Sequence, residues 1–160
     1  MNTGVNSAII RVAADGSPGS RRAFEWAMDE ARLRRCGVEL VAAYRVATDA
    51  THDQARQRAE RAVHDTMDEA LAADPRPPAI TWLVVEGEPA DVLVHESAQS
   101  QLLVMGSHDV SGMVHSGQPS VTDLCARMAD CPVVIVPPAR TNGLAGEELL
   151  VTGTGVSDPA

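Results

Sequence analysis

The sequence predicts an α/β protein in which helices cover both faces of a parallel sheet. Short apolar runs rich in strand-forming residues alternate with longer segments whose apolar residues recur every three or four positions. The connections between successive apolar runs are longer than about ten residues, the length that a crossover between parallel strands requires. These observations predict a five-stranded, doubly wound parallel sheet with right-handed connections.

The first half of the chain supplies three strands and two helices of this pattern. An apolar run at residues 8–14, interrupted by Arg11, predicts the first strand, and Ser17 followed by Pro18 is typical of a helix start. That helix is expected to span residues 18–36 and to end at Gly37. Further strands are expected at residues 38–46 and 79–85, with a helix at residues 57–73 between them. Residues 47–55 are polar and receive no assignment.

The second half repeats the alternation. A helix is expected at residues 90–100 and a buried strand at residues 102–105, stopped by Gly106. A small, polar loop follows and leads through Pro119 and Ser120 into a helix at residues 121–130. The last strand is the β-branched run at residues 133–136, which prolines flank on both sides.

After residue 102 the expected order is strand, glycine-containing loop and helix start. This arrangement is suited to binding phosphate. Such a loop collects free backbone N–H groups beside the positive end of a helix dipole. It requires no catalytic side chain. The sequence therefore indicates a binding crevice at this place.

From Gly106 to Cys131 the chain resembles the universal stress protein family. In that family an apolar strand leads to Gly-Ser, a phosphate loop of the form Gly-x-x-Gly-(nine residues)-Gly-Ser/Thr, a helix and a Cys-Pro-Val-Val strand. Gly106, Ser120 and Cys131 match this pattern without a gap. Two motif glycines are replaced, one by Asp109 and the other by Pro119.

The resemblance implies a Rossmann-like fold of the adenine nucleotide alpha hydrolase type with strand order 3-2-1-4-5. It also implies an ATP site, with magnesium, whose phosphates are surrounded by a set of turn and loop residues. These are Asp15, Gly16, Gly106, Ser107 and Ser120. Asp109 adds a negative charge and Pro119 removes an N–H donor, so we expect both to weaken ATP binding.

Composition excludes several other classes of protein. The net charge is −9 and the chain has no lysine, which disfavours binding to nucleic acid or to an acidic membrane surface. No apolar stretch is long enough to span a membrane and the first residues lack a signal-peptide pattern, so we expect a cytoplasmic protein.

Cys36, Cys125 and Cys131 are expected to be small buried hydrophobes. The length suits one domain at residues 1–138, followed by a flexible tail at residues 139–160.

The function that the sequence favours is a stress-response or regulatory binding module rather than an enzyme. The serines lack a nucleophile-elbow pattern, and His108, Asp109 and His115 lack a fixed zinc-ligand spacing. The alternative is a protein-interaction module of the same fold that no longer binds nucleotide. An adenylating or flavin-carrying enzyme is a third class, although the chain has no room for the further domain such an enzyme would add.

The last strand also predicts assembly. In the order 3-2-1-4-5 it lies at a sheet edge, and exposed edges of strongly β-forming sequence invite pairing. The resemblance implies a homodimer formed there, and a regulatory protein partner is a further expectation. The pairing residues would be Val133, Val134, Ile135 and Val136.

Overall fold

The protein is described by a computed structural model that covers residues 8–48, 50–107 and 119–139. Its strands are β1 (Ile9–Ala13), β2 (Gly37–Tyr44), β3 (Ile80–Glu86), β4 (Leu102–Gly106) and β5 (Val133–Val136). Over these residues the strands are all parallel and form a five-stranded sheet in the order β3-β2-β1-β4-β5. The predicted fold class and strand order are confirmed.

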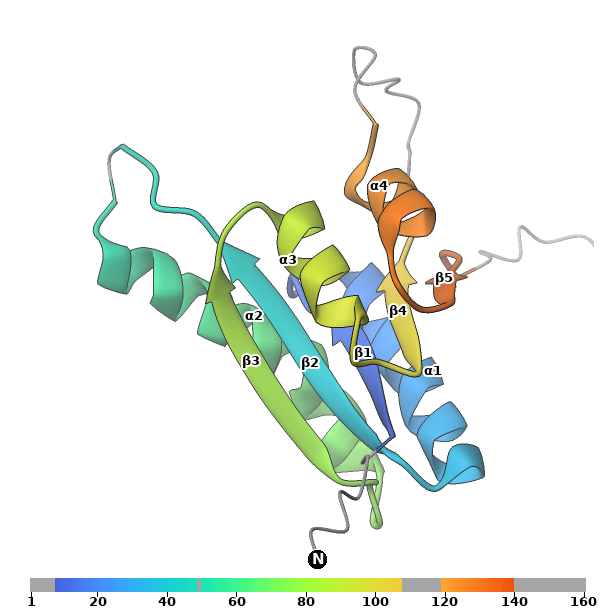
Figure 1. The fold of residues 1–160 in the computed structure, drawn as a ribbon. Helices are drawn as coiled ribbons and strands as arrows, with labels where there is room; N and C mark the ends of the chain where they lie inside the picture. Colours follow the sequence, from blue (N-terminus) through green and yellow to red (C-terminus); the bar gives the residue numbers. More distant parts are fainter. Residues whose placement is uncertain (1–7, 49, 108–118, 140–160) are drawn as a thin grey trace, which may run out of the picture.

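Helices cover both faces of this sheet. They are α1 (Pro18–Arg34), α2 (His52–Ala73), α3 (Pro89–Ser97) and α4 (Val121–Met128). Figure 1 shows α1 and α2 behind the sheet and α3 and α4 in front of it. The sheet is therefore doubly wound, and burial of β4 on both faces explains why its sequence is a continuous apolar run.

Each of these helices differs from its sequence-based bounds at one end or both, and the differences in α1 and α2 have a clear local cause. The first helix ends at Arg34, three residues before Gly37, because Arg35 adopts a left-handed backbone conformation with φ 56° and caps α1. The N–H of Cys36 then reaches the carbonyl of Ala31 at 3.0 Å, which closes the helix end. The second helix begins at His52 rather than at residue 57, because Thr51 and Gln54 form a reciprocal capping box.

The core lies on both sides of the sheet. Against α1 and α2 the fully buried side chains include Phe24, Ile10 and Val63. Against α3 and α4 they include Leu103 and Cys125. Burial raises the pKa of the Cys125 thiol to about 11, so this thiol is neutral at physiological pH and packs as a small hydrophobe.

The arginine that interrupts the first strand is held by acidic partners. Arg11 donates through Nε to Glu39 Oε2 at 2.6 Å, and its Nη2 lies 3.4 Å from Glu96 Oε2. The same guanidinium bonds the Ser100 hydroxyl at 3.2 Å. Because Glu96 and Ser100 flank the end of α3, this network fastens α3 to the sheet.

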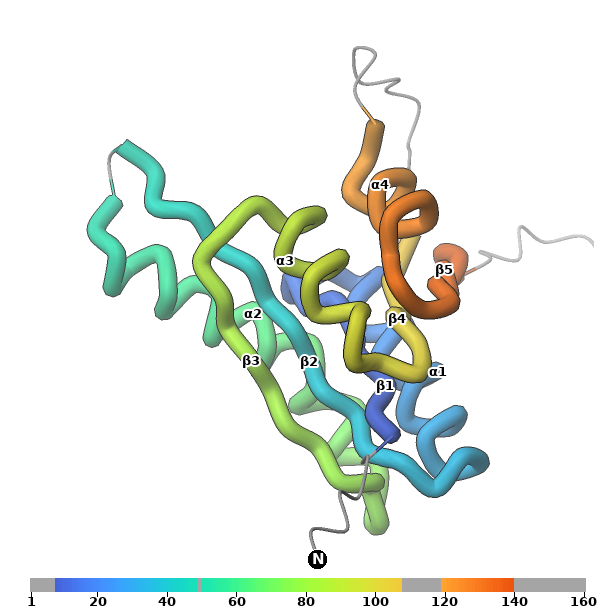
Figure 2. Tube along the Cα trace, in the orientation of Figure 1, coloured from blue at the N-terminus to red at the C-terminus, as the bar shows by residue number. Residues whose placement is uncertain are grey.

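The sheet leaves β3 and β5 at its two edges, as the tube in Figure 2 shows. The Asp109 loop and the expected tail from residue 140 onward lie outside the described residues. Among the helices that are described, none is both long and apolar enough to cross a bilayer.

Candidate functional site

A cavity of about 440 Å³ opens at the carboxyl ends of the strands. Residues at or just after the ends of β1, β2 and β4 line it, together with α2 and the first residues of α3 and α4. The strand order reverses between β1 and β4, and in open α/β sheets this is where ligands bind. The fold therefore places this cavity where a ligand crevice is expected.

Small side chains shape the cavity wall. The α2 residues Ala55, Ala59 and Ala62 recur at helical spacing and face the cavity together. Ala42 and Ala43 from β2 also line the cavity. Because alanines project little, α2 and the sheet leave an apolar space between them, and such a space suits a flat, apolar ring.

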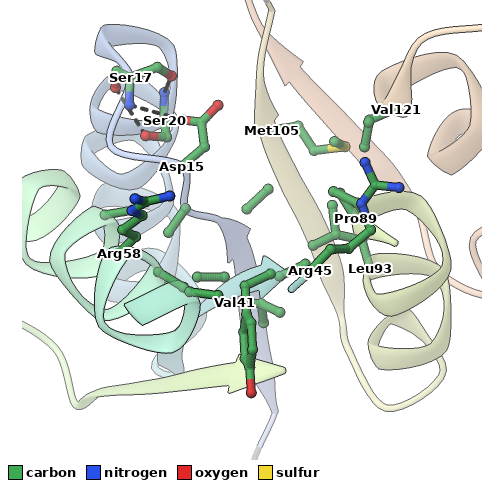
Figure 3. Close-up of a pocket in the computed structure, with 18 of the residues that line it drawn as sticks. Asp15, Ser17, Ser20, Val41, Arg45, Arg58, Pro89, Leu93, Met105 and Val121 are labelled. Atoms are coloured by element: carbon green, nitrogen blue, oxygen red, sulfur yellow. Dashed lines mark hydrogen bonds between the residues drawn. The ribbon is translucent and has the colours of Figure 1, made fainter. Parts of the chain in front are cut away.

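The turn after β1 is well ordered by its own side chains. Asp15 Oδ1 accepts a hydrogen bond from the Ser17 N–H at 2.9 Å, and Ser17 Oγ accepts one from the Ser20 N–H at 3.1 Å. Gly16 occupies a left-handed conformation with φ 77°, and its N–H donates to Thr66 Oγ1 at 3.3 Å. Asp15, Ser17 and Ser20 line the cavity, whereas Gly16 is not among the lining residues. The dashed lines in Figure 3 mark hydrogen bonds of this turn between lining residues that are drawn, such as Ser17 and Ser20.

Gly106 lines the cavity and has a structural role that the sequence did not reveal. A Cβ at this position would lie 2.3 Å from the carbonyl carbon of Gly19 in the first turn of α1. The end of β4 can thus approach the start of α1 this closely only because residue 106 is glycine; a Cβ on Gly19 would lie 3.1 Å from the Ser107 carbonyl oxygen, a tight contact. Their contact brings the two predicted parts of the site together.

Ser107 and Ser120 are outside the cavity lining. The Ser107 N–H donates to the Val136 carbonyl at 2.8 Å, while its buried hydroxyl has no hydrogen-bond partner among the described residues. Ser120 caps α4: its Oγ accepts from the Asp123 N–H at 3.1 Å and donates to Asp123 Oδ2 at 2.9 Å. Hydrogen bonds from Ser120 hold the pKa of the Asp123 carboxyl below its usual value.

Two arginines that the sequence did not indicate as site residues line the cavity. Arg45 follows β2 and forms an ion pair with Glu88, and Arg58 lies on α2 beside the alanines. The position of Arg45 at a strand's carboxyl end was a usable signal. Arg58 had none, because only the packing of α2 on the sheet shows which helix face meets the cavity.

No group of three or more His, Cys, Asp or Glu residues able to hold a metal is found in the described part of the chain. The trio of His108, Asp109 and His115 lies outside it.

Fold and cavity together define a doubly wound, Rossmann-like α/β protein with a ligand crevice at its switch point. The model of the universal stress protein family matches residues 8–137. This chain therefore belongs to the universal stress protein family.

Curated relatives carry the same family name. Universal stress protein Rv2028c of Mycobacterium tuberculosis is 31% identical over 166 residues, an alignment that covers 99% of this chain and 58% of the relative. Universal stress protein Rv2005c of the same species is 32% identical over 135 residues, covering 80% of this chain and 45% of the relative. The chain thus spans about half the length of these relatives.

Solved structures share the fold. A universal stress protein crystallised in complex with cAMP is 25% identical with a TM-score of 0.66, and the match covers 81% of this chain and 96% of that one. A family member from Burkholderia pseudomallei is 24% identical with a TM-score of 0.62, covering 84% and 99% respectively.

Proposed function

We propose that this chain is a regulatory binding module of the stress response that takes an adenine nucleotide into the cavity at the switch point. The observation that carries the proposal is the cavity itself. It combines an apolar, alanine-lined space with the Asp15 turn and Gly106 at the carboxyl ends of β1 and β4. The relative of known structure that holds cAMP supports the same class of ligand.

Binding rather than catalysis is the proposed output, and the cytoplasm is its proposed location. Ser17 and Ser120 serve as helix caps in this structure, and each accepts a backbone N–H of its helix. ATP with magnesium is proposed as a weak ligand, because Asp109 and Pro119 stand in the loop where the family motif has glycines.

The alternative is a protein-interaction module that has lost the nucleotide. The departures at Asp109 and Pro119 favour it, since both weaken the device that would hold several phosphates. A regulatory partner would then act on the fold's surface.

Native mass spectrometry of the purified protein distinguishes the two. The proposal predicts a bound or added adenine nucleotide on the wild type and its loss in Ala47→Trp, which places a large ring at the cavity lining. Ala73→Trp, at the exposed end of α2, is the matched control and should retain the ligand. A wild type that carries no nucleotide at saturating concentration would favour the interaction module.

A further inference from the structure

The charged side chains that line the cavity are distributed unevenly. Among the described residues they are Asp15, Arg45 and Arg58. Arg45 is engaged by Glu88, whereas Arg58 forms no ion pair with any residue that the structure describes. Figure 3 shows Arg58 on the Asp15 side of the cavity and Arg45 on the Val121 side.

The position of Arg58 suits an anionic ligand. It lies on α2 between Ala55 and Ala59, whose small side chains leave space for a guanidinium at the edge of the apolar wall. Arg56 on the same helix is instead paired with Glu60 at 3.1 Å and does not line the cavity. A guanidinium bonds phosphate through two parallel N–H donors, so an arginine at this place suits a single phosphate group.

The opposite side of the cavity disfavours a longer phosphate chain. Val121 and Thr122 place the start of α4 at the cavity, but the first turn of this helix carries Asp123. Asp123 Oδ2 accepts from the Ser120 N–H at 3.2 Å and from the Ser120 hydroxyl at 2.9 Å. Ser120 and Asp123 are not among the lining residues, but the carboxylate occupies the Ser120 donors next to Val121 and adds a negative charge where the helix dipole is positive. The first turn of α1 has no acidic residue.

We propose that Arg58 is the phosphate-binding residue of this cavity. We further propose that Asp123 makes the cavity select nucleotides with a single phosphate over triphosphates, whether that phosphate is a monoester, as in AMP, or a cyclic diester, as in cAMP. This inference rests on the proposed adenine-nucleotide function and specifies its ligand. The base would occupy the alanine-lined space, and the one phosphate would meet Arg58 at its edge.

Isothermal titration calorimetry with adenosine, AMP, cAMP and ATP, each with and without Mg²⁺, tests the selection. The wild type should bind AMP or cAMP more tightly than ATP. Whichever of AMP and cAMP binds more tightly shows whether the cavity prefers a phosphate monoester or a cyclic phosphate. Arg58→Gln should weaken that ligand about tenfold or more and leave adenosine unchanged, because only the phosphate contact is lost. Arg58→Lys keeps the charge without the paired donors, so its affinity for that ligand should lie between those of the wild type and Arg58→Gln.

Matched control variants separate specific effects of Arg58 and Asp123 on phosphate binding from a general loss of folding or binding. Asp123→Asn should strengthen ATP binding about tenfold with little effect on AMP, whereas Asp68→Asn, an equal charge change on the outer surface of α2, should not. Arg56→Gln should behave as wild type. Equal effects of Arg58→Gln and Arg56→Gln, equal loss of adenosine in Arg58→Gln, or wild-type ATP binding as tight as AMP would overturn the inference and leave the function standing. Absence of binding for all four ligands would refute the function and the inference together.

Discussion

Gly106 joins the sheet to the start of α1, and its lack of a side chain is a requirement of packing. The nearest atoms to a Cβ placed there are all backbone atoms of Gly19, at 2.3–2.7 Å. Backbone atoms cannot rotate away as the end of a long side chain can. The residue therefore fixes how closely α1 approaches β4, and with it the position of the Asp15 turn at the cavity.

Gly106→Ala should lower the free energy of unfolding by about 3 kcal/mol, because the added methyl group forces α1 away from β4. Urea denaturation measures the loss. Gly37→Ala is the control, since its Cβ would meet the Ala79 carbonyl oxygen at 3.3 Å, a contact that a small shift relieves. Similar stabilities of Gly106→Ala and Gly37→Ala would contradict this role of the close approach.

At this scale the sequence could place some site residues and not others. Asp15 and Gly106 were predictable at the cavity, because each follows an apolar strand and the strands' carboxyl ends share one edge. Arg58 was not, because its helix has arginines on several faces and sequence spacing alone does not say which face meets the sheet. Ser120 was expected near phosphate, yet its partner in the structure is Asp123.

Helix α1 ends with a residue whose backbone conformation favours glycine. Arg35 has φ 56° and ψ 45°, and its side chain is exposed. The sequence predicted Gly37 as the stop, but Gly37 begins β2 instead. A helix can end in the left-handed conformation without glycine when backbone hydrogen bonds close the last turn, as the N–H groups of Arg35 and Cys36 do here.

Arg35→Gly should raise the free energy of unfolding by about 0.5–1 kcal/mol. Relief of the left-handed strain exceeds the added flexibility that glycine gives the unfolded chain. Thermal and urea denaturation give the value. Arg34→Gly, one residue earlier in the helical conformation and paired with Glu30 at 2.5 Å, should instead be destabilised. An Arg35→Gly protein no more stable than wild type would show that the helix end carries no such strain.

The order of elements was predictable because apolar runs and helical stripes are long and alternate strictly. The boundaries of the elements were less predictable where local side-chain hydrogen bonds decide them. The start of α2 is an example: Thr51 caps the helix and the Gln54 side chain accepts the Thr51 N–H at 3.0 Å. This capping box lies in a polar stretch without apolar periodicity, so the sequence pattern left it unassigned.

Among the residues that the structure describes, β5 is the strand at one edge of the sheet. The N–H groups of Leu103 and Ser107 on the β4 side reach the carbonyls of Pro132 and Val136, at 3.0 and 2.8 Å. In a parallel ladder, alternate residues bond to the same neighbour, so Val133 and Ile135 direct their backbone groups outward. A two-fold axis at Val134 would pair Val133 of one copy with Ile135 of the other in antiparallel fashion.

The predicted homodimer follows from this edge. Ile135 is 44% exposed, so Ile135→Arg should weaken dimerisation at least about tenfold by placing an unpaired charge in the contact. Sedimentation equilibrium at micromolar concentration measures it. Leu33→Arg, at an 80% exposed position on α1, is the control. A monomeric wild type, or a dimer that Ile135→Arg leaves unchanged, would contradict assembly through β5.

The central claim is that an adenine nucleotide occupies the cavity at the carboxyl ends of the strands. Titration of AMP into ¹⁵N-labelled protein, followed by amide chemical shifts, tests it most directly. We expect saturable shifts concentrated in residues 13–15, 42–45 and 55–62, which contain many of the cavity's lining residues. An absence of shifts at saturating nucleotide, or shifts concentrated along β3 or β5, would contradict it.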